Sequence, residues 1–181
     1  MNLPNILTIL RVVMIPFFVA AFLTEGISDW ITLAIFVLAA ITDYFDGAIA
    51  RKQNIVTDFG KLMDPLADKL MVMSAFICFT SAGLLHPIVT IVIMSREFLV
   101  TGLRMVASSK GKVIAADFWG KLKTVFQDVT IIAILFQSAI SAGEGSFIGT
   151  IVYLCIWIMT VLTLVSAANY CIKNKEFFAG K

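Results

Sequence analysis

Apolar residues run along this chain in six long stretches that short polar connectors separate. Each stretch is close to the roughly 20 residues that an α-helix needs to cross the hydrocarbon core of a bilayer. The pattern therefore predicts an all-α integral membrane protein, a bundle of six transmembrane helices that forms a single domain over residues 1–181. We expect the helices at about 6–23, 30–50, 61–82, 87–107, 121–141 and 147–171.

Composition supports a membrane protein over an ordinary soluble domain. Hydrophobic residues make up 60% of the chain and charged residues 14%, against about 45–50% and 25% in soluble proteins. The first apolar run lacks a small-residue cleavage site, so we interpret it as a retained helix and not as a signal peptide. The three cysteines lie in apolar runs without CxxC spacing, which favours a packing role.

The distribution of Lys and Arg predicts which side of the membrane each connector faces. Three connectors carry neither residue: 24–29, 81–87 and 141–146. The basic residues gather in or near the other connectors and the tail: 51–61, 108–121 and 173–181. Because cytoplasmic loops carry the excess of Lys and Arg, both termini are predicted on the cytoplasmic side of the cell membrane.

The first stretch carries a polar stripe at helical spacing, formed by Asn5, Thr8 and Arg11. Two interpretations stay open. A short N-terminal interfacial helix would turn the stripe toward lipid headgroups, whereas a helix of the bundle would turn it inward. Pro16 is expected to kink or end the first part of this helix.

Four aspartates stand at helical spacing at the predicted cytoplasmic ends of the second and third helices. Asp43 and Asp46 are three residues apart, and Asp64 and Asp68 are four apart, so each pair shares a helix face. A return of about ten residues, 51–60, should make the two pairs face each other. Their mutual repulsion predicts divalent cations between them, although a network with nearby Arg and Lys side chains is an alternative.

Hard divalent cations prefer oxygen ligands, and Mg²⁺ is typically held by a few carboxylates together with substrate phosphates. Two such ions about 3.5–4 Å apart can clamp a phosphoryl group during in-line displacement. Carboxylates alone do not distinguish Mg²⁺ from Mn²⁺. Gly47 and Gly60 remove side-chain bulk near the aspartates, which suits either ligand approach or close helix packing.

The aspartates belong to a longer motif, DxxDGxxAR, eight residues and then GxxxDxxxD. All its fixed positions are filled: Asp43, Asp46, Gly47, Ala50, Arg51, Gly60, Asp64 and Asp68. This pattern resembles the signature of the CDP-alcohol phosphatidyltransferases, and the six-segment layout is similar to that family over nearly the whole chain. The looser motifs MNLPNILTILR, REFLVTGLR and GKLKT are most similar to bacterial members that use glycerol 3-phosphate as acceptor.

The resemblance implies a role for each motif residue. Asp43, Asp46, Asp64 and Asp68 would hold two divalent cations, with Asp68 also the general base. The cytidine diphosphate end of CDP-diacylglycerol would contact a wider set: Gly47, Ala50, Arg51, Gly60, Asn5 and Thr8. The acceptor hydroxyl would attack the β-phosphorus, and CMP would leave. The resemblance also implies a homodimer through transmembrane helices.

The acceptor site is predicted from basic residues on the fourth and fifth segments. Arg104 and Lys121 are expected to bind an acceptor phosphate, and Arg96 to pair with Glu97 or share that role. Attraction to anionic lipid headgroups explains some of the remaining basic residues. A phosphate-bearing acceptor favours glycerol 3-phosphate or inositol 1-phosphate over serine.

A function of another class, an ion or proton transporter, also uses carboxylates inside a helical bundle. Such a protein would place polar groups across the full depth of the membrane. Here the acidic cluster lies on one side and the outer halves of the stretches are almost wholly apolar. The sequence therefore favours an enzyme that acts on membrane lipid, with no indication of nucleic-acid binding.

Overall fold

The computed structural model describes residues 3–24, 26, 28–53, 58–109, 117–143 and 145–175. Within its helices it does not describe the side chains of residues 3–8, 43–53, 58–66, 68 and 109. All regular structure in the described part is α-helical, and it comprises six helices: α1 (Leu3–Leu23), α2 (Asp29–Gln53), α3 (Asp58–Ser81), α4 (Pro87–Ser109), α5 (Phe118–Ala139) and α6 (Phe147–Lys173).

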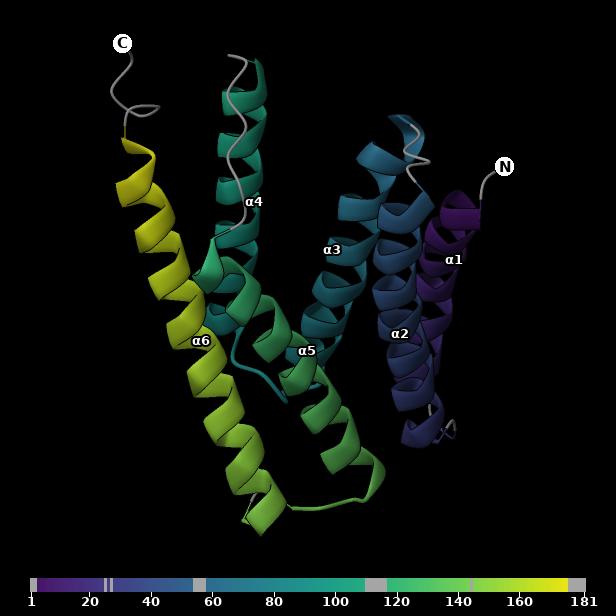
Figure 1. The fold of residues 1–181 in the computed structure, drawn as a ribbon. Coiled ribbons are helices and arrows are strands. Elements are labelled where there is room, and N and C mark those ends of the chain that lie inside the picture. The colour runs from purple at the N-terminus through teal and green to yellow at the C-terminus, as the bar shows by residue number, and fades with distance from the viewer. Residues whose placement is uncertain are drawn as a thin grey trace.

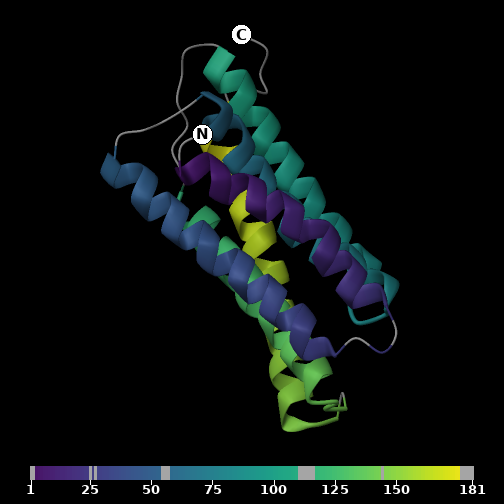
Figure 2. The same cartoon turned by 90° about the vertical axis from the view of Figure 1, so that its right-hand side faces the viewer.

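The helices form a bundle in which α5 connects two groups. Figure 1 shows α1, α2 and α3 together on one side and α4 with α6 on the other, with α5 running between them. α1 packs on both α2 and α3, α5 packs on α6 and α2, and α4 packs on α6. Figure 2 shows α1 and α2 as antiparallel neighbours. The start of α1 and the end of α6 both lie at the upper end of the bundle in Figure 1.

Aromatic side chains fill the core where α1, α2 and α3 meet. Phe18, Phe36, Phe76 and Phe79 are fully or almost fully buried. The rings of Phe18 and Phe36 lie 6.0 Å apart, and those of Phe22 and Phe79 lie 5.6 Å apart. Such tilted ring pairs at 4.5–7 Å add to the stabilisation from burial alone. This packing fixes α2 and α3, which carry the aspartates, on the common support of α1.

The helix boundaries agree with the sequence-based expectation to within a few residues, with two local differences. α1 continues through Pro16 and does not end there. α2 extends to Gln53 and α3 begins at Asp58, so only 54–57 separate the helices where a return of about ten residues was expected. Asp58 is thus the first residue of α3 and not a loop residue.

Two helices of the described part, α5 and α6, are long and apolar enough to cross a membrane. α1, α2 and α3 contribute shorter described apolar stretches, Ile9–Leu23, Asp29–Thr42 and Lys69–Ser81. Large apolar side chains are exposed on every helix, among them Phe17, Leu38, Ile77, Phe98, Val125 and Trp157. Four charged side chains of the described part are buried: Arg11, Arg96, Glu97 and Lys123. This inverted distribution is typical of a protein surrounded by lipid.

Candidate active site

The aspartate motif lies on two continuous helices. Positions 43, 46, 47, 50 and 51 are in α2, and positions 60, 64 and 68 are in α3. The predicted helical spacing within each set therefore holds for the backbone. The side chains of these residues lie outside the described part, as do those of Asn5 and Thr8, so their predicted contacts remain predictions.

The donor set of the motif fits a hard divalent cation. Four carboxylates on two helices that both pack on α1 supply only oxygen ligands, the chemistry that Mg²⁺ and Mn²⁺ prefer. Among the side chains that the structure describes, no three His, Cys, Asp or Glu groups could hold a metal ion together. The four aspartates are not among those side chains, so they are the candidates for this role.

Arg11 on α1 is buried, with 2% of its surface exposed. It lines a small cavity of about 40 Å³ together with Ala40 of α2, Val72 of α3 and Asp128 of α5. The polar stripe of α1 therefore turns inward at Arg11, which supports the second of the two interpretations of that stripe.

A larger cavity of about 380 Å³ lies where α3, α4 and α5 meet. Its volume falls in the range of about 300–1,000 Å³ that small-molecule sites occupy. Among the side chains that the structure describes, the ionisable residues that line it are five cations and one acid: Lys69, Arg96, Arg104, Lys121, Lys123 and Glu97. We refer to it as the basic cavity. The three residues predicted to bind the acceptor phosphate, Arg96, Arg104 and Lys121, thus line one cavity.

The floor of the basic cavity is a buried network centred on Glu97. Glu97 Oε1 accepts a hydrogen bond from Arg96 Nη1 at 3.0 Å and another from Lys123 Nζ. Lys123 Nζ also donates to Gln127 Oε1 at 2.8 Å. All four side chains are at least nine-tenths buried. The carboxylate therefore neutralises part of the charge of Arg96 and Lys123, and the predicted pairing of Arg96 with Glu97 is confirmed.

Arg96 also joins α4 to α5 and α6. Its Nη2 donates to Ser166 Oγ of α6 at 2.7 Å. A Cβ at Gly120 of α5 would lie 3.4 Å from this same Nη2, so the small residue leaves room for the guanidinium. Fixed by both Glu97 and Ser166, Arg96 is held rigidly at the junction of three helices.

Arg104 and Lys121 are the exposed cations of the basic cavity. Arg104 Nε donates to the hydroxyl of Tyr170 of α6 at 3.3 Å, and the guanidinium carbon lies 6.0 Å from the centre of the tyrosine ring. Neither cation is neutralised by an ion pair among the described residues. These two side chains can therefore meet an anion that enters from solvent.

Lys69 connects the basic cavity to the aspartate motif, because it directly follows Asp68 in α3 and lines the cavity. Its Nζ donates to Thr101 Oγ1 of α4, and Thr101 Oγ1 donates to the backbone carbonyl of Glu97 at 2.7 Å. Val72, four residues after Asp68 and so on the same helix face, also lines the cavity. The cavity thus lies beside the face of α3 that carries position 68.

Four residues in or next to the basic cavity were not predicted from the sequence as parts of the acceptor site: Lys69, Lys123, Gln127 and Tyr170. Ionisable and polar residues inside apolar stretches are a default signal of function, and Lys123 and Gln127 carry that signal. Tyr170 carries none. Asp128, seven residues after Lys121 in α5, lines the small cavity beside Arg11 and not the basic cavity.

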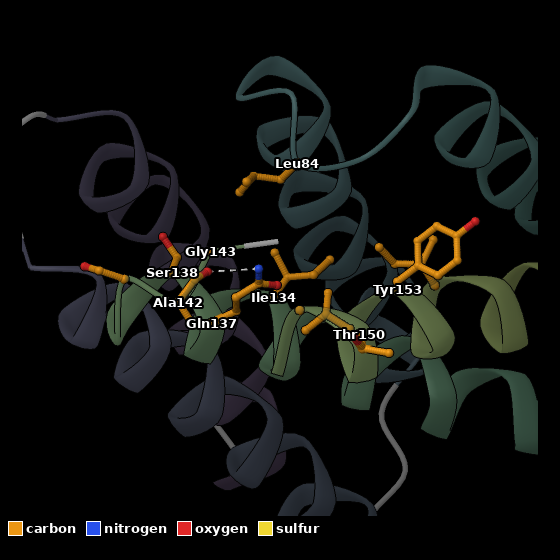
Figure 3. Close-up of a pocket in the computed structure, with 12 residues that line it drawn as sticks. Leu84, Ile134, Gln137, Ser138, Ala142, Gly143, Thr150 and Tyr153 are labelled. Carbon is orange, nitrogen blue, oxygen red and sulfur yellow. Dashed lines mark hydrogen bonds between the residues drawn. The ribbon is translucent and has the colours of Figure 1, made fainter. Parts of the chain in front are cut away.

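Another cavity, of about 580 Å³, lies at the α5–α6 connection (Figure 3), and Figure 1 shows this connection at the end of the bundle away from the start of α1. Leu84, Ile134 and Tyr153 line it with small and polar residues of the α5–α6 connection, and Gln137 Nε2 donates to the carbonyl of Ala142 at 3.1 Å. Its described lining residues carry polar and apolar side chains and no Lys, Arg, Asp or Glu.

Comparisons with known proteins match most of this chain. The family model for CDP-alcohol phosphatidyltransferase matches residues 1–166. A CDP-diacylglycerol–glycerol-3-phosphate 3-phosphatidyltransferase of Bacillus subtilis is 39% identical, with 97% of this chain and 96% of the relative covered. One of Rickettsia felis is 35% identical over 98% and 97%. A probable phosphatidylglycerophosphate synthase of Mycobacterium tuberculosis is 45% identical over 72% of this chain and 64% of its own.

The motif and the two helices that carry it, α2 and α3, lie within the matched residues 1–166. An ion or proton transporter does not fit this match, and the chain is an enzyme of lipid metabolism. It belongs to the CDP-alcohol phosphatidyltransferase family.

Proposed function

We propose that this enzyme transfers the phosphatidyl group of CDP-diacylglycerol to glycerol 3-phosphate, which makes it a phosphatidylglycerophosphate synthase. The products are phosphatidylglycerophosphate and CMP. The names of the relatives supply the substrates, and one structural observation supports the acceptor in particular. The basic cavity beside position 68 presents two exposed cations, Arg104 and Lys121, to an anion.

The acceptor phosphate binds at Arg104 and Lys121. Guanidinium groups form two parallel charge-assisted hydrogen bonds with a phosphate, and these are about twice as strong as neutral ones. Tyr170 occupies only the Nε edge of Arg104, which leaves both amino groups for the phosphate. Serine carries no phosphate and would leave these cations unpaired, so a phosphorylated polyol is the better acceptor.

The reaction itself needs a base and a leaving group. The carboxylate of Asp68 takes the proton from the terminal hydroxyl of the acceptor, and the hydroxyl oxygen forms a bond to the β-phosphorus. The bond from that phosphorus to the bridging pyrophosphate oxygen breaks, and CMP leaves with the oxygen. A general base of this kind contributes roughly 10²–10⁴-fold to the rate.

Asp43, Asp46, Asp64 and Asp68 hold the divalent cations, which neutralise the pyrophosphate when they are bound. Gly47, Ala50, Arg51 and Gly60, with Asn5 and Thr8 of α1, contact the cytidine diphosphate. Two cations lie near the motif. Lys69 is half-buried and directly follows Asp68 in α3, and Arg11 is buried and lines the small cavity with Ala40 of α2. They limit the repulsion among the four carboxylates.

The site operates at the cytoplasmic edge of the cell membrane, with all six helices in the bilayer. The exposed apolar side chains on every helix, and the Lys and Arg of the 51–61, 108–121 and 173–181 segments, support this orientation. The acyl chains of the donor then stay in lipid while the acceptor enters from water. The homodimer that the family resemblance implies stays a prediction.

The decisive experiment uses the purified, detergent-solubilised chain with Mg²⁺, CDP-diacylglycerol and labelled glycerol 3-phosphate. We expect CMP release that requires all three, with the label in a lipid product. Parallel reactions contain inositol 1-phosphate or serine. CMP release with either of these but not with glycerol 3-phosphate would overturn the proposed acceptor, and no release with any acceptor would overturn the transferase.

A further inference from the structure

Gln127 of α5 has an amide group with a hydrogen-bond partner on its oxygen but none on its nitrogen among the described residues. Its Oε1 accepts the hydrogen bond from Lys123 Nζ at 2.8 Å. An ammonium group has only donors, so the oxygen of the amide must face Lys123 and the nitrogen must face the other way. The orientation of this amide is therefore fixed by chemistry.

The nitrogen of that amide is a buried donor without an acceptor. Gln127 has 2% of its surface exposed, and its Nε2 finds no hydrogen-bond partner among the described residues. A buried donor left unpaired costs free energy, which is why most are satisfied by protein, ligand or water. Gln127 lines the basic cavity, so a molecule in the cavity can supply the missing acceptor.

The position of Gln127 indicates which part of an acceptor it would meet. It follows Lys121 on α5 by six residues, a rise of about 9 Å along the helix, so it lies deeper than the cations that bind the phosphate. It lines the cavity together with Val72, which shares a face of α3 with position 68. A phosphorylated polyol held at Lys121 with its reacting end toward Asp68 therefore passes Gln127 with its carbon backbone.

We propose that Gln127 is a specificity-determining residue that donates a hydrogen bond from Nε2 to the middle, non-reacting hydroxyl of glycerol 3-phosphate. Lys123 and Glu97 hold the amide in the orientation that this bond requires. The inference rests on the proposed function, because it names a contact within the same acceptor site. It adds a contact to the hydroxyl, whereas Arg104 and Lys121 contact the phosphate.

The test compares glycerol 3-phosphate with 3-hydroxypropyl phosphate, which keeps the phosphate and the reacting hydroxyl but lacks the middle hydroxyl. We expect the wild-type enzyme to prefer glycerol 3-phosphate about three- to tenfold in kcat/KM, the size of one neutral hydrogen bond. Gln127→Met, which removes the donor at similar volume, should bring this ratio close to one. Because both rates come from the same preparation, the ratio does not depend on the folded fraction.

Two further variants complete the test. Gln137→Met is the matched control, since Gln137 lies on the same helix but lines the cavity at the other end (Figure 3), and it should keep the wild-type ratio. Gln127→Asn keeps an amide but withdraws it by one methylene, and it serves if the methionine variant does not fold. It should also lower the ratio.

The proposal is overturned if wild type uses both phosphates equally well, or if the Gln127 variants keep the wild-type ratio. The latter outcome would assign the amide nitrogen to an ordered water. Failure of the proposed function itself is a separate result, because wild type would then release no CMP with glycerol 3-phosphate at all.

Discussion

Arg104 of α4, which lines the basic cavity, contacts Tyr170 of α6. Arg104 Nε lies 3.3 Å from the tyrosine hydroxyl, and the guanidinium carbon lies 6.0 Å from the ring centre. The tyrosine is buried while the arginine is exposed, so a core residue orients a solvent-facing one. This contact binds one edge of the guanidinium and leaves the other for a phosphate.

Arg104→Gln should raise the KM for glycerol 3-phosphate about ten- to hundredfold, because a hydrogen bond to a charged group contributes roughly 1.5–3 kcal/mol. The KM for CDP-diacylglycerol should change little. Steady-state kinetics with each substrate varied in turn measure both values. Equal increases in the two KM values would instead indicate that Arg104 has a structural role.

Tyr170→Phe removes the hydroxyl but keeps the ring, so it isolates the hydrogen bond to Arg104. We expect the KM for glycerol 3-phosphate to rise about two- to tenfold, the effect of losing one neutral partner. In the Arg104→Gln background the same change should add little, because the two residues act through one guanidinium. Additive effects in the double variant would show that Tyr170 acts by another route.

Glu97 is expected to be the most sensitive position of the basic cavity for folding. Glu97→Gln removes the negative charge shared by Arg96 and Lys123 and leaves two buried cations without it. Breaking a buried pair from one side costs about 3–5 kcal/mol. The free energy of unfolding in detergent should fall accordingly. The double variant Glu97→Gln with Lys123→Met should recover part of the loss, since it removes one of the stranded charges.

A matched control for that measurement is Lys173→Met, which breaks an ion pair whose lysine is mostly exposed. Exposed pairs contribute about 0–1 kcal/mol, so this variant should remain close to wild type. If Lys173→Met destabilises as much as Glu97→Gln, burial is not what makes the Glu97 network important.

The local sequence pattern was sufficient to predict the six helices and to assign the motif positions to the second and third of them. Apolar stretches bounded by Gly, Ser and Pro predicted six helices with boundaries close to those observed, because each helix satisfies its backbone hydrogen bonds within a single segment. Of the two outcomes expected at Pro16, a kink or an end of the helix, the second does not occur, because α1 continues to Leu23. A proline removes one backbone hydrogen bond and can disrupt a helix locally, whereas Phe18 and Phe22, which follow Pro16 in α1, pack on Phe36 of α2 and Phe79 of α3.

Tertiary contacts were harder to predict from the sequence. Arg96 and Glu97 are adjacent, and their pairing was foreseen. The partners of Arg96 in α6 and of Glu97 in α5 lie 70 and 26 residues away, and no spacing rule joins such positions. Gln127 and Tyr170 were missed for the same reason, because their roles arise only when α4, α5 and α6 pack together.

Asp68→Asn tests the proposed base. The amide keeps the size of the side chain but cannot accept the proton, so we expect kcat to fall about 10²–10⁴-fold. Binding of CDP-diacylglycerol, measured with labelled lipid at equilibrium, should be largely retained. Asp58→Asn is the control, because Asp58 lies off the motif spacing at the start of α3, and it should stay close to wild-type activity. Near-full turnover by Asp68→Asn would remove it as the base.

Asp117, at the N-terminus of α5, fastens this helix to the end of α6. Lys173 Nζ donates to its Oδ1 at 2.9 Å, and Asn169 Nδ2 donates to its Oδ2. The hydrogen bond from Lys173 is the main reason that the pKa of Asp117 lies below its ordinary value, with smaller contributions from the charge of Lys173, Phe118 N–H and Asn169. The folded protein therefore stabilises the charged form of this carboxyl group.

Because the pKa of Asp117 is lowered in the folded protein, its contribution to stability increases with pH. The stabilisation from Asp117 is complete above the ordinary pKa of about 3.9 and is lost as the pH falls through the lower pKa of the folded state. Asp117→Asn should therefore unfold at a lower temperature than wild type at about pH 6, and the difference should shrink toward zero as the pH falls below about 4. Thermal unfolding of both proteins in the same detergent measures it, and the difference cancels the titration of other carboxylates. Lys173→Met removes only one of the two partners of Asp117, so it should lower the unfolding temperature at about pH 6 only slightly. A difference that stays constant down to about pH 2.5 would show that Asp117 stabilises the α5–α6 contact without its charge.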